Sequence, residues 1–323
     1  MTTETTATNV MLGWAIEEFG GPEKMRITQL PMPQPGPGDV LIRMRGAEIG
    51  NWDALIREGG WDLDRPFPLV LGLGGSGVVV ATGEDVDDVY VGDSVYTYCY
   101  PLYENGAWAE YMLVPSMYVA QAPASLDLIH SGAIPIVALT AHETLHDILA
   151  VHKGEVVLIT AGAGGVGHLA VQMAKMLGAH VIATASTRNV EFVQNLGAEV
   201  VIDYTKEDVA ALLKSKFPQG VDKALNGVAG DTANQILHTV RPGGRMVDMT
   251  DSVTESRADV DLNKNYIVKA DAARLTTIAT LIDEGGLQVV VQAVCPFEEA
   301  PKALELAVAG HVRGKLVLNI ETV

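Results

Sequence analysis

The stretch at residues 155–188, EVVLITAGAGGVGHLAVQMAKMLGAHVIATASTR, decides the fold of this 323-residue chain. It begins with the apolar, β-branched run 156–159, which is too short for a helix and predicts a buried parallel strand. Glycines in G-x-G-x-x-G spacing follow, then a helical apolar period over 166–177 and a second strand over 180–185. This order predicts an α/β fold with the doubly wound parallel sheet of a Rossmann domain.

The glycines of the turn, Gly162, Gly164 and Gly167, each have a mechanical role. They permit the tight turn, the close approach of a pyrophosphate to the backbone, and the packing of the helix on the strand. The N–H groups that open the helix, at Gly165, Val166 and Gly167, would face the phosphates together with the positive end of the helix dipole. Glycine-rich turns without a ligand are common, but the surrounding strand–turn–helix–strand pattern favours a dinucleotide site.

The end of the second strand indicates which dinucleotide binds. Enzymes that use NAD place Asp or Glu there to hold the ribose diol, whereas this chain has Ala185, Ser186, Thr187 and Arg188. Hydroxyls and a guanidinium suit a 2′-phosphate, and no carboxylate stands there to repel it. The sequence therefore favours NADPH. The alternative is that Ser186 caps the next helix and Arg188 is a solvated surface charge.

Composition narrows the class of protein. A formal net charge of −18 argues against nucleic acid or an anionic membrane as a partner. No run of 18 apolar residues predicts a membrane helix, and residues 1–10 lack the pattern of a signal peptide and predict an unstructured tail. The two cysteines, Cys99 and Cys295, form no metal-binding spacing. These features together fit a cytoplasmic protein.

The pattern along the chain changes near residue 125. Before it lie short strands separated by Gly, Asp and Pro, with one short helix over 51–57, which predicts a β-rich barrel-like domain. After it, strands alternate with helices, including a helix over 232–240 followed by a turn in the segment RPGG. The tail returns to strand–helix–strand, and its last strand, 315–320, could rejoin the first domain.

Taken together, these motifs resemble the medium-chain dehydrogenase/reductase superfamily, in its zinc-independent quinone oxidoreductase branch. The matching segments are 72–77, 106–111, 139–141, 161–167, 241–245 and 310–315. The resemblance implies a GroES-like catalytic domain formed by 1–124 and 291–323, and a Rossmann NADPH-binding domain at 125–290. It also implies a homodimer.

The departures from the zinc-dependent members concern the metal ligands. Those members carry a cysteine and a histidine where this chain has Gly50 and Leu73, which cannot ligate a metal. The four-cysteine lobe of the zinc alcohol dehydrogenases is also absent. We therefore expect no catalytic zinc. Quinone-type members often have Tyr near residue 61, where this chain has Trp61.

The resemblance also suggests individual site residues. Asn51 stands at the position that meets the nicotinamide or the substrate oxygen, with a turn-forming asparagine as the alternative. Tyr204 and Arg313 match cofactor contacts, and Tyr100, from the cluster Tyr96, Tyr98, Tyr100 and Tyr103, is our candidate proton donor. Plain packing or surface exposure is the alternative for each of them.

The segment His142–His146 matches the metalloprotease pattern H-E-x-x-H. However, Thr140 and Glu143 also have the spacing of a capping box at a helix start, and no third metal ligand is evident. We interpret the segment as an ordinary helix beside the nicotinamide, with Thr140 and His142 as cofactor contacts.

The sequence thus predicts an NADPH-dependent reductase that transfers hydride to a quinone or to the C=C bond of an α,β-unsaturated ketone or aldehyde. These acceptors suit a site without zinc because the developing charge is delocalised. The alternative is a protein that binds NADPH without turnover, as a redox sensor or scaffold.

Overall fold

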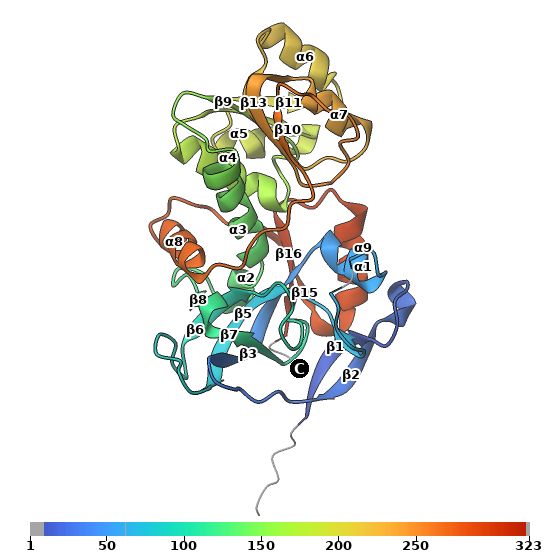
Figure 1. The fold of residues 1–323 in the computed structure, drawn as a ribbon, viewed down its shortest axis with the longest axis vertical. Coiled ribbons are helices and arrows are strands. Elements are labelled where there is room, and N and C mark those ends of the chain that lie inside the picture. Colours follow the sequence, from blue (N-terminus) through green and yellow to red (C-terminus); the bar gives the residue numbers. More distant parts are fainter. Residues whose placement is uncertain (1–9, 62, 321–323) are drawn as a thin grey trace, which may run out of the picture.

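The computed structural model describes residues 10–61 and 63–320, which form one parallel sheet and two further sheets (Figure 1). The parallel sheet with its helices forms the upper part of Figure 1, and the β-rich part lies below it. Except for Val10, the tail expected at residues 1–10 lies outside the described residues.

The parallel sheet has the strand order of a doubly wound nucleotide-binding fold. Its spatial order is β11 (Val200–Asp203), β10 (His180–Ala185), β9 (Val156–Ile159), β12 (Val221–Asn226), β13 (Val240–Asp248) and β14 (Asp261–Asn263). Its helices are α4 (Gly165–Met176), α5 (Val190–Asn195), α6 (Val209–Lys216) and α7 (Asp231–Leu237). The order reverses beside β9, and in such sheets ligands bind outside the carboxyl ends of the strands at this point.

The β-rich part consists of a three-stranded and a seven-stranded sheet. The first joins β2 (Arg26–Pro31), β1 (Val10–Ile16) and β4 (Leu69–Val70). The second runs β15 (Val291–Pro296), β16 (Lys315–Asn319), β3 (Asp39–Ile49), β5 (Gly74–Thr82), β6 (Ser94–Tyr98) and β8 (Val119–Gln121), with β7 (Tyr111–Pro115) on β3. Strand β16 pairs with β3, so the last strand does return to the first part of the chain. The exact domain boundaries stay a prediction.

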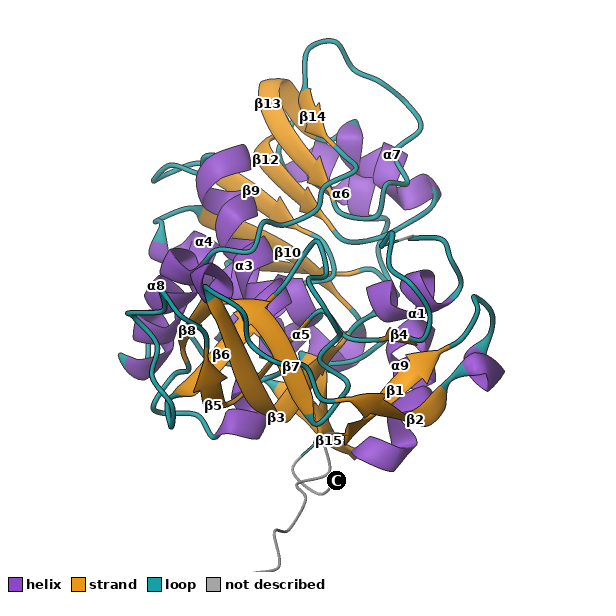
Figure 2. Cartoon of the chain, turned by 60° about the horizontal axis from the view of Figure 1, so that its bottom comes forward, coloured by secondary structure: helices purple, strands orange, loops and turns teal. Residues whose placement is uncertain are grey.

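The other helices pack beside the β-rich part or between the two parts. These are α1 (Asn51–Arg57), α2 (Leu128–Ser131), α3 (Pro135–Glu143), α8 (Ala272–Asp283) and α9 (Ala300–Ala309), with the π-helix η3 (Thr144–Ile148). Short 3₁₀ turns are η1 (Pro22–Lys24), η2 (Ser116–Tyr118), η4 (Thr187–Asn189) and η5 (Phe297–Glu299). Figure 2 shows α3 next to α4, and α3 also contacts β5 and β6, so one hydrophobic core runs through both parts.

Two local predictions are wrong. The capping box does not form, because α3 begins at Pro135 and Thr140 lies well inside the helix, with Glu143 at its end. Proline at the first helical position, which has no N–H to satisfy, is the real start signal. The second error concerns α7, which ends at Leu237, so that the RPGG segment lies inside β13 rather than in a turn before it. Gly243, with φ of 74°, accommodates the irregular backbone there.

Candidate active site

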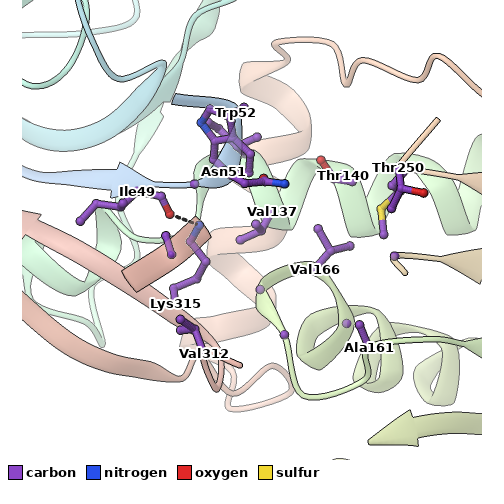
Figure 3. Close-up of a pocket in the computed structure, with 18 of the residues that line it drawn as sticks. Ile49, Asn51, Trp52, Val137, Thr140, Ala161, Val166, Thr250, Val312 and Lys315 are labelled. Carbon is purple, nitrogen blue, oxygen red and sulfur yellow. Dashed lines mark hydrogen bonds between the residues drawn. The ribbon is translucent and has the colours of Figure 1, made fainter. Parts of the chain in front are cut away.

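A cavity of about 670 Å³ lies where the two parts of the chain meet (Figure 3). Its lining comes from the end of β3 and α1, from α3, from the turn after β9, and from the segments 266–268 and 307–316. The turn after β9 belongs to the parallel sheet, whereas α1 and β16 belong to the β-rich part. The cavity therefore joins the predicted dinucleotide turn to the predicted active-site loop.

The dinucleotide turn leaves no room for side chains at its key glycines. A Cβ on Gly167 would come within 2.1 Å of the Ala161 carbonyl oxygen, and one on Gly162 within 3.0 Å of Ala183 Cβ. Gly164 N donates to Ala161 O at 2.9 Å and closes the turn. These contacts give Gly162 and Gly167 the packing roles that the spacing predicts.

The opening turn of α4 faces the cavity. Gly164, Gly165, Val166 and Gly167 all line it, and Val166 points into it in Figure 3. The first N–H groups of a helix have no partner within the helix, and the helix dipole adds positive potential there. The turn therefore fits the pyrophosphate of a nicotinamide dinucleotide.

The side chains predicted to select the cofactor gather at the end of β10. Arg313 donates through Nε to Asn189 Oδ1 (2.8 Å) and through Nη2 to Arg188 O (3.0 Å). Arg188 in turn donates to the carbonyl of His311, a residue of the cavity wall, at 2.8 Å. Ser186 precedes η4, but its side chain does not cap that turn. Two guanidinium groups therefore lie just beyond the cavity wall.

Asp203 is a residue that sequence reasoning missed in this region. Its carboxylate accepts hydrogen bonds from Thr187 Oγ1 and Thr205 Oγ1, both at 2.6 Å, and these bonds lower its pKa to about 2. It ends β11 in register with Ala185, and Tyr204 beside it is 46% exposed. The sequence does contain a signal for it, because an aspartate ends the strand that follows the one ending at Ala185. This carboxylate orders Thr187 rather than standing free at the end of β10.

The active-site loop is built from the end of β3 and the start of α1. Asn51 is the first residue of α1, lies exposed and lines the cavity (Figure 3). Asp53 fixes the loop by accepting from Gly50 N at 2.9 Å. The Trp52 ring lies over Gly50, where an added Cβ would come within 2.3 Å of Cζ2, so the ring takes the space of a side chain at position 50. The loop therefore presents the Asn51 amide to whatever occupies the cavity.

A buried ionic cluster, which sequence reasoning also missed, supports this loop. Lys315 Nζ donates to Ile49 O at 2.7 Å (Figure 3). The same Nζ lies 3.1 Å from Glu48 Oε1. Burial raises the pKa of Glu48, although the Lys315 ammonium and the Ile136 N–H oppose the rise. Burial also raises the pKa of Asp53 to about 7, against the hydrogen bond from Gly50. Lys315 is the one lysine or arginine among the described residues that line the cavity.

The other end of the cavity is apolar and aromatic, and Tyr100 does not line it. Trp61 lies in front of Tyr100, with ring centroids 4.9 Å apart, and donates from Nε1 to the Tyr100 hydroxyl at 3.1 Å. Tyr98 lines the cavity, but its hydroxyl donates to Val268 O at 3.2 Å, and burial raises its pKa. The Tyr98 hydroxyl is therefore engaged, whereas the Tyr100 hydroxyl accepts from Trp61 and lies behind it. Tyr100 as the proton donor stays a prediction.

The structure separates Thr140 from His142. Thr140 lines the cavity, whereas the His142 ring stacks on His146 at 3.9 Å and its Nδ1 lies 3.1 Å from Arg274 Nη1. Burial lowers the pKa of His142 to about 4. The i, i+4 stacking on α3 and η3 thus turns the His142 ring to α8, and its contact with the cofactor stays a prediction. Among the described residues, no three His, Cys, Asp or Glu side chains form a metal-binding group.

Comparison with known proteins identifies the family. The family models for a zinc-binding dehydrogenase and for an alcohol dehydrogenase GroES-like domain match residues 196–318 and 36–124. A mitochondrial NAD(P)H oxidoreductase RTN4IP1 from Bos taurus is 30% identical, over 99% of this chain and 92% of its own length. A chloroplastic NADPH-dependent alkenal/one oxidoreductase from Arabidopsis thaliana is 29% identical, over 95% of this chain and 79% of its own length.

Similarity in structure agrees with similarity in sequence. The solved quinone oxidoreductase from Coxiella burnetii superposes with a TM-score of 0.88 at 30% identity, covering 96% of this chain and 99% of the other. The dinucleotide turn, the cavity between the two parts and the GroES-like part agree with these matches. The chain belongs to the medium-chain dehydrogenase/reductase superfamily, in its quinone oxidoreductase-like branch, and is an oxidoreductase that uses a nicotinamide cofactor.

Proposed function

We propose that this protein transfers hydride from NADPH to a conjugated acceptor, either a quinone or the C=C bond of an α,β-unsaturated ketone or aldehyde. The observation that carries this proposal is the single cavity shared by the dinucleotide turn, Asn51 and an apolar wall containing Trp61. The relatives named as quinone and alkenal/one oxidoreductases are consistent with both acceptor classes.

The residues at the end of β10 support NADPH over NADH. Arg188 and Arg313 lie together there, and both offer guanidinium groups of the kind that bind a phosphate. The nearest carboxylate of the neighbouring strand, Asp203, is already hydrogen-bonded to Thr187 and Thr205. When bound, NADPH would supply the hydride, and these residues would hold its adenosine end.

The chemistry of the cavity favours acceptors that spread negative charge. Gly50 and Leu73 stand where zinc-dependent members carry ligands, so hydrogen bonds take the part of a Lewis acid. The Asn51 amide lines the cavity, where it can donate a hydrogen bond to the acceptor oxygen. The Tyr98 hydroxyl is bonded to Val268 O and Tyr100 does not line the cavity, so we assign the proton to water.

An acceptor panel tests this proposal. Purified protein with NADPH should reduce a quinone or an enone with a higher kcat/KM than a saturated ketone of the same size. Chelation of metals should leave the rate unchanged. The proposal fails if the saturated ketone, or an alcohol with the oxidised cofactor, is the better substrate, or if activity needs one zinc per chain.

The oligomer and the cell compartment complete the proposal. We infer a homodimer through the parallel sheet, since its edge strand β14 has β13 as its one neighbour among the described strands. Sedimentation at micromolar concentration tests this. We also keep the cytoplasm as the predicted location. The described part of the chain contains no helix that is both long and apolar enough to span a membrane.

A further inference from the structure

Lys315 lies where the elements around the cavity meet (Figure 3). Its Nζ donates to Ile49 O at 2.7 Å, and it lies 4.7 Å from the centre of the Trp52 ring. The stem of the same side chain passes Gly165, where an added Cβ would come within 2.8 Å of Lys315 Cδ. One side chain therefore touches both the active-site loop and the dinucleotide turn.

Glu48 extends this contact to the helix behind the cavity. Its Oε2 accepts from Ile136 N at 2.8 Å, in the first turn of α3, and its Oε1 lies 3.1 Å from Lys315 Nζ. Both side chains are buried. The Glu48–Lys315 pair thus ties together β3, β16 and α3, the helix that brings Thr140 to the cavity.

Stability alone does not explain a buried pair of this kind. Replacing a buried ion pair by apolar groups of similar shape is often neutral or stabilising, because both charges must be desolvated. The cluster is also unbalanced, since Asp53, a second carboxylate, lies buried beside the same ammonium. The ammonium group of Lys315 contacts Ile49, Glu48 and Trp52, so its direct partners belong to the loop and to the strand before it.

We propose that Lys315 is a positioning residue for hydride transfer. Its ammonium holds Ile49 and Trp52, the neighbours of Asn51, while its stem rests on Gly165. Lys315 therefore fixes the distance between the loop that contacts the acceptor and the turn that contacts the cofactor. This inference rests on the proposed function, because it assigns the spacing to the same reaction.

Four variants separate positioning from plain stability. These are Lys315→Met, Glu48→Gln, the double variant, and Lys302→Met as a control at a lysine whose side chain is 79% exposed on α9. For each we would measure urea unfolding without cofactor, the Kd for NADPH, and the single-turnover rate of NADPH oxidation by a quinone or an enone.

We expect Lys315→Met to slow the single turnover by about 10–100-fold, the loss typical of a small misplacement of reacting groups. The Kd for NADPH should change by no more than about twofold, as should every property of Lys302→Met. In the double variant much of the stability lost in Lys315→Met should return, because Glu48 no longer leaves a buried, unpaired carboxylate, while the turnover stays slow. A double variant that regains both stability and rate would overturn the proposal.

Trp52 gives a readout that needs no turnover. The fluorescence of Trp52 is obtained by subtracting the signal of the matching Trp52→Phe variant. Without cofactor, acrylamide should quench this fluorescence more strongly in Lys315→Met than in the wild type. Unchanged quenching would show that Lys315 does not hold the loop, whatever the activity. If the wild-type protein reduces none of the conjugated acceptors with NADPH, the proposed function fails. The quenching result would still decide whether Lys315 holds the loop.

Discussion

The two ends of the cavity differ in how they are encoded. The dinucleotide end is built from one contiguous unit, β9, the glycine turn and α4, within 21 residues of chain. The acceptor end is assembled from α1, α3, the segment 266–268 and the tail before β16, which converge from more than 250 residues of sequence. A local unit can be recognised from spacing alone, whereas an assembled one depends on tertiary contacts. The consequences of mutation should differ accordingly.

The largest effect is expected at the dinucleotide end, from Gly167→Ala. The added methyl group would collide with the Ala161 carbonyl, which is backbone and cannot turn away. We expect the free energy of unfolding to fall by about 1–3 kcal/mol, as for other overpacked sites, and NADPH binding to become undetectable. Gly286→Ala is the matched control, since its methyl would lie 3.4 Å from Leu281 O. Normal NADPH binding by Gly167→Ala would contradict the geometry of the turn.

Arg188→Ala should weaken the adenosine end without affecting the acceptor end. Loss of a charge-assisted contact to the 2′-phosphate costs about 1.5–3 kcal/mol of NADPH affinity, while NADH affinity should not change. Titration of both cofactors by fluorescence measures this, with Arg26→Ala on the exposed face of β2 as the control. Equal affinity of the wild type for the two cofactors would remove the basis for NADPH preference.

Asp53→Asn tests the acceptor end through its electrostatics. Asp53 has a folded pKa of about 7 and an unfolded pKa of about 3.9, so the folded state binds more protons between these values. Stability should therefore fall as pH rises from 4 to 7, by up to about 1.4 kcal/mol per pH unit. Asparagine keeps the acceptor for Gly50 N and removes this term.

The expected signature is a difference between the two proteins that grows with pH and levels off above pH 7. Urea unfolding of wild type and variant across this range measures it. A difference that is constant with pH would show that Asp53 stays ionised in the folded protein.

The smallest effect is expected from His142→Ala, although the sequence suggested a cofactor contact. Its ring lies against His146 and Arg274, away from the cavity. Both the NADPH Kd and the turnover should remain within about twofold of wild type. A larger loss of NADPH affinity would place His142 at the cofactor after all.

Much of the fold could be predicted because its signals are local. The strand 156–159, the strand 180–185 and the helix 51–57 have the bounds that the pattern predicts. The capping box failed since Thr140-x-x-Glu143 occurs by chance inside a helix that starts earlier, at Pro135. The RPGG segment misled because a strand can absorb Gly243 as an irregularity.

The candidate site could be predicted only at positions where the residue type and its spacing have one usual function. The glycines belong to that class, and Asn51 was reached through family resemblance. Lys315 was matched as part of a closing motif, but its contact with Ile49 spans 266 residues of sequence. Lysine is rarely fully buried, so a lysine at the start of an apolar strand does not predict a buried contact with Glu48. The contact that puts Trp61 in front of Tyr100 is tertiary as well, and the sequence pattern does not show it.

One measurement tests the central claim most directly. A single turnover with NADPH that carries deuterium at the transferred position of C4 should be slower than one with ordinary NADPH, with a quinone or with an enone as acceptor. With the enone as substrate, the label should appear on the β-carbon of the product. Label on the carbonyl carbon, or cofactor oxidation that neither slows with deuterium nor transfers the label, would contradict hydride transfer to a conjugated acceptor.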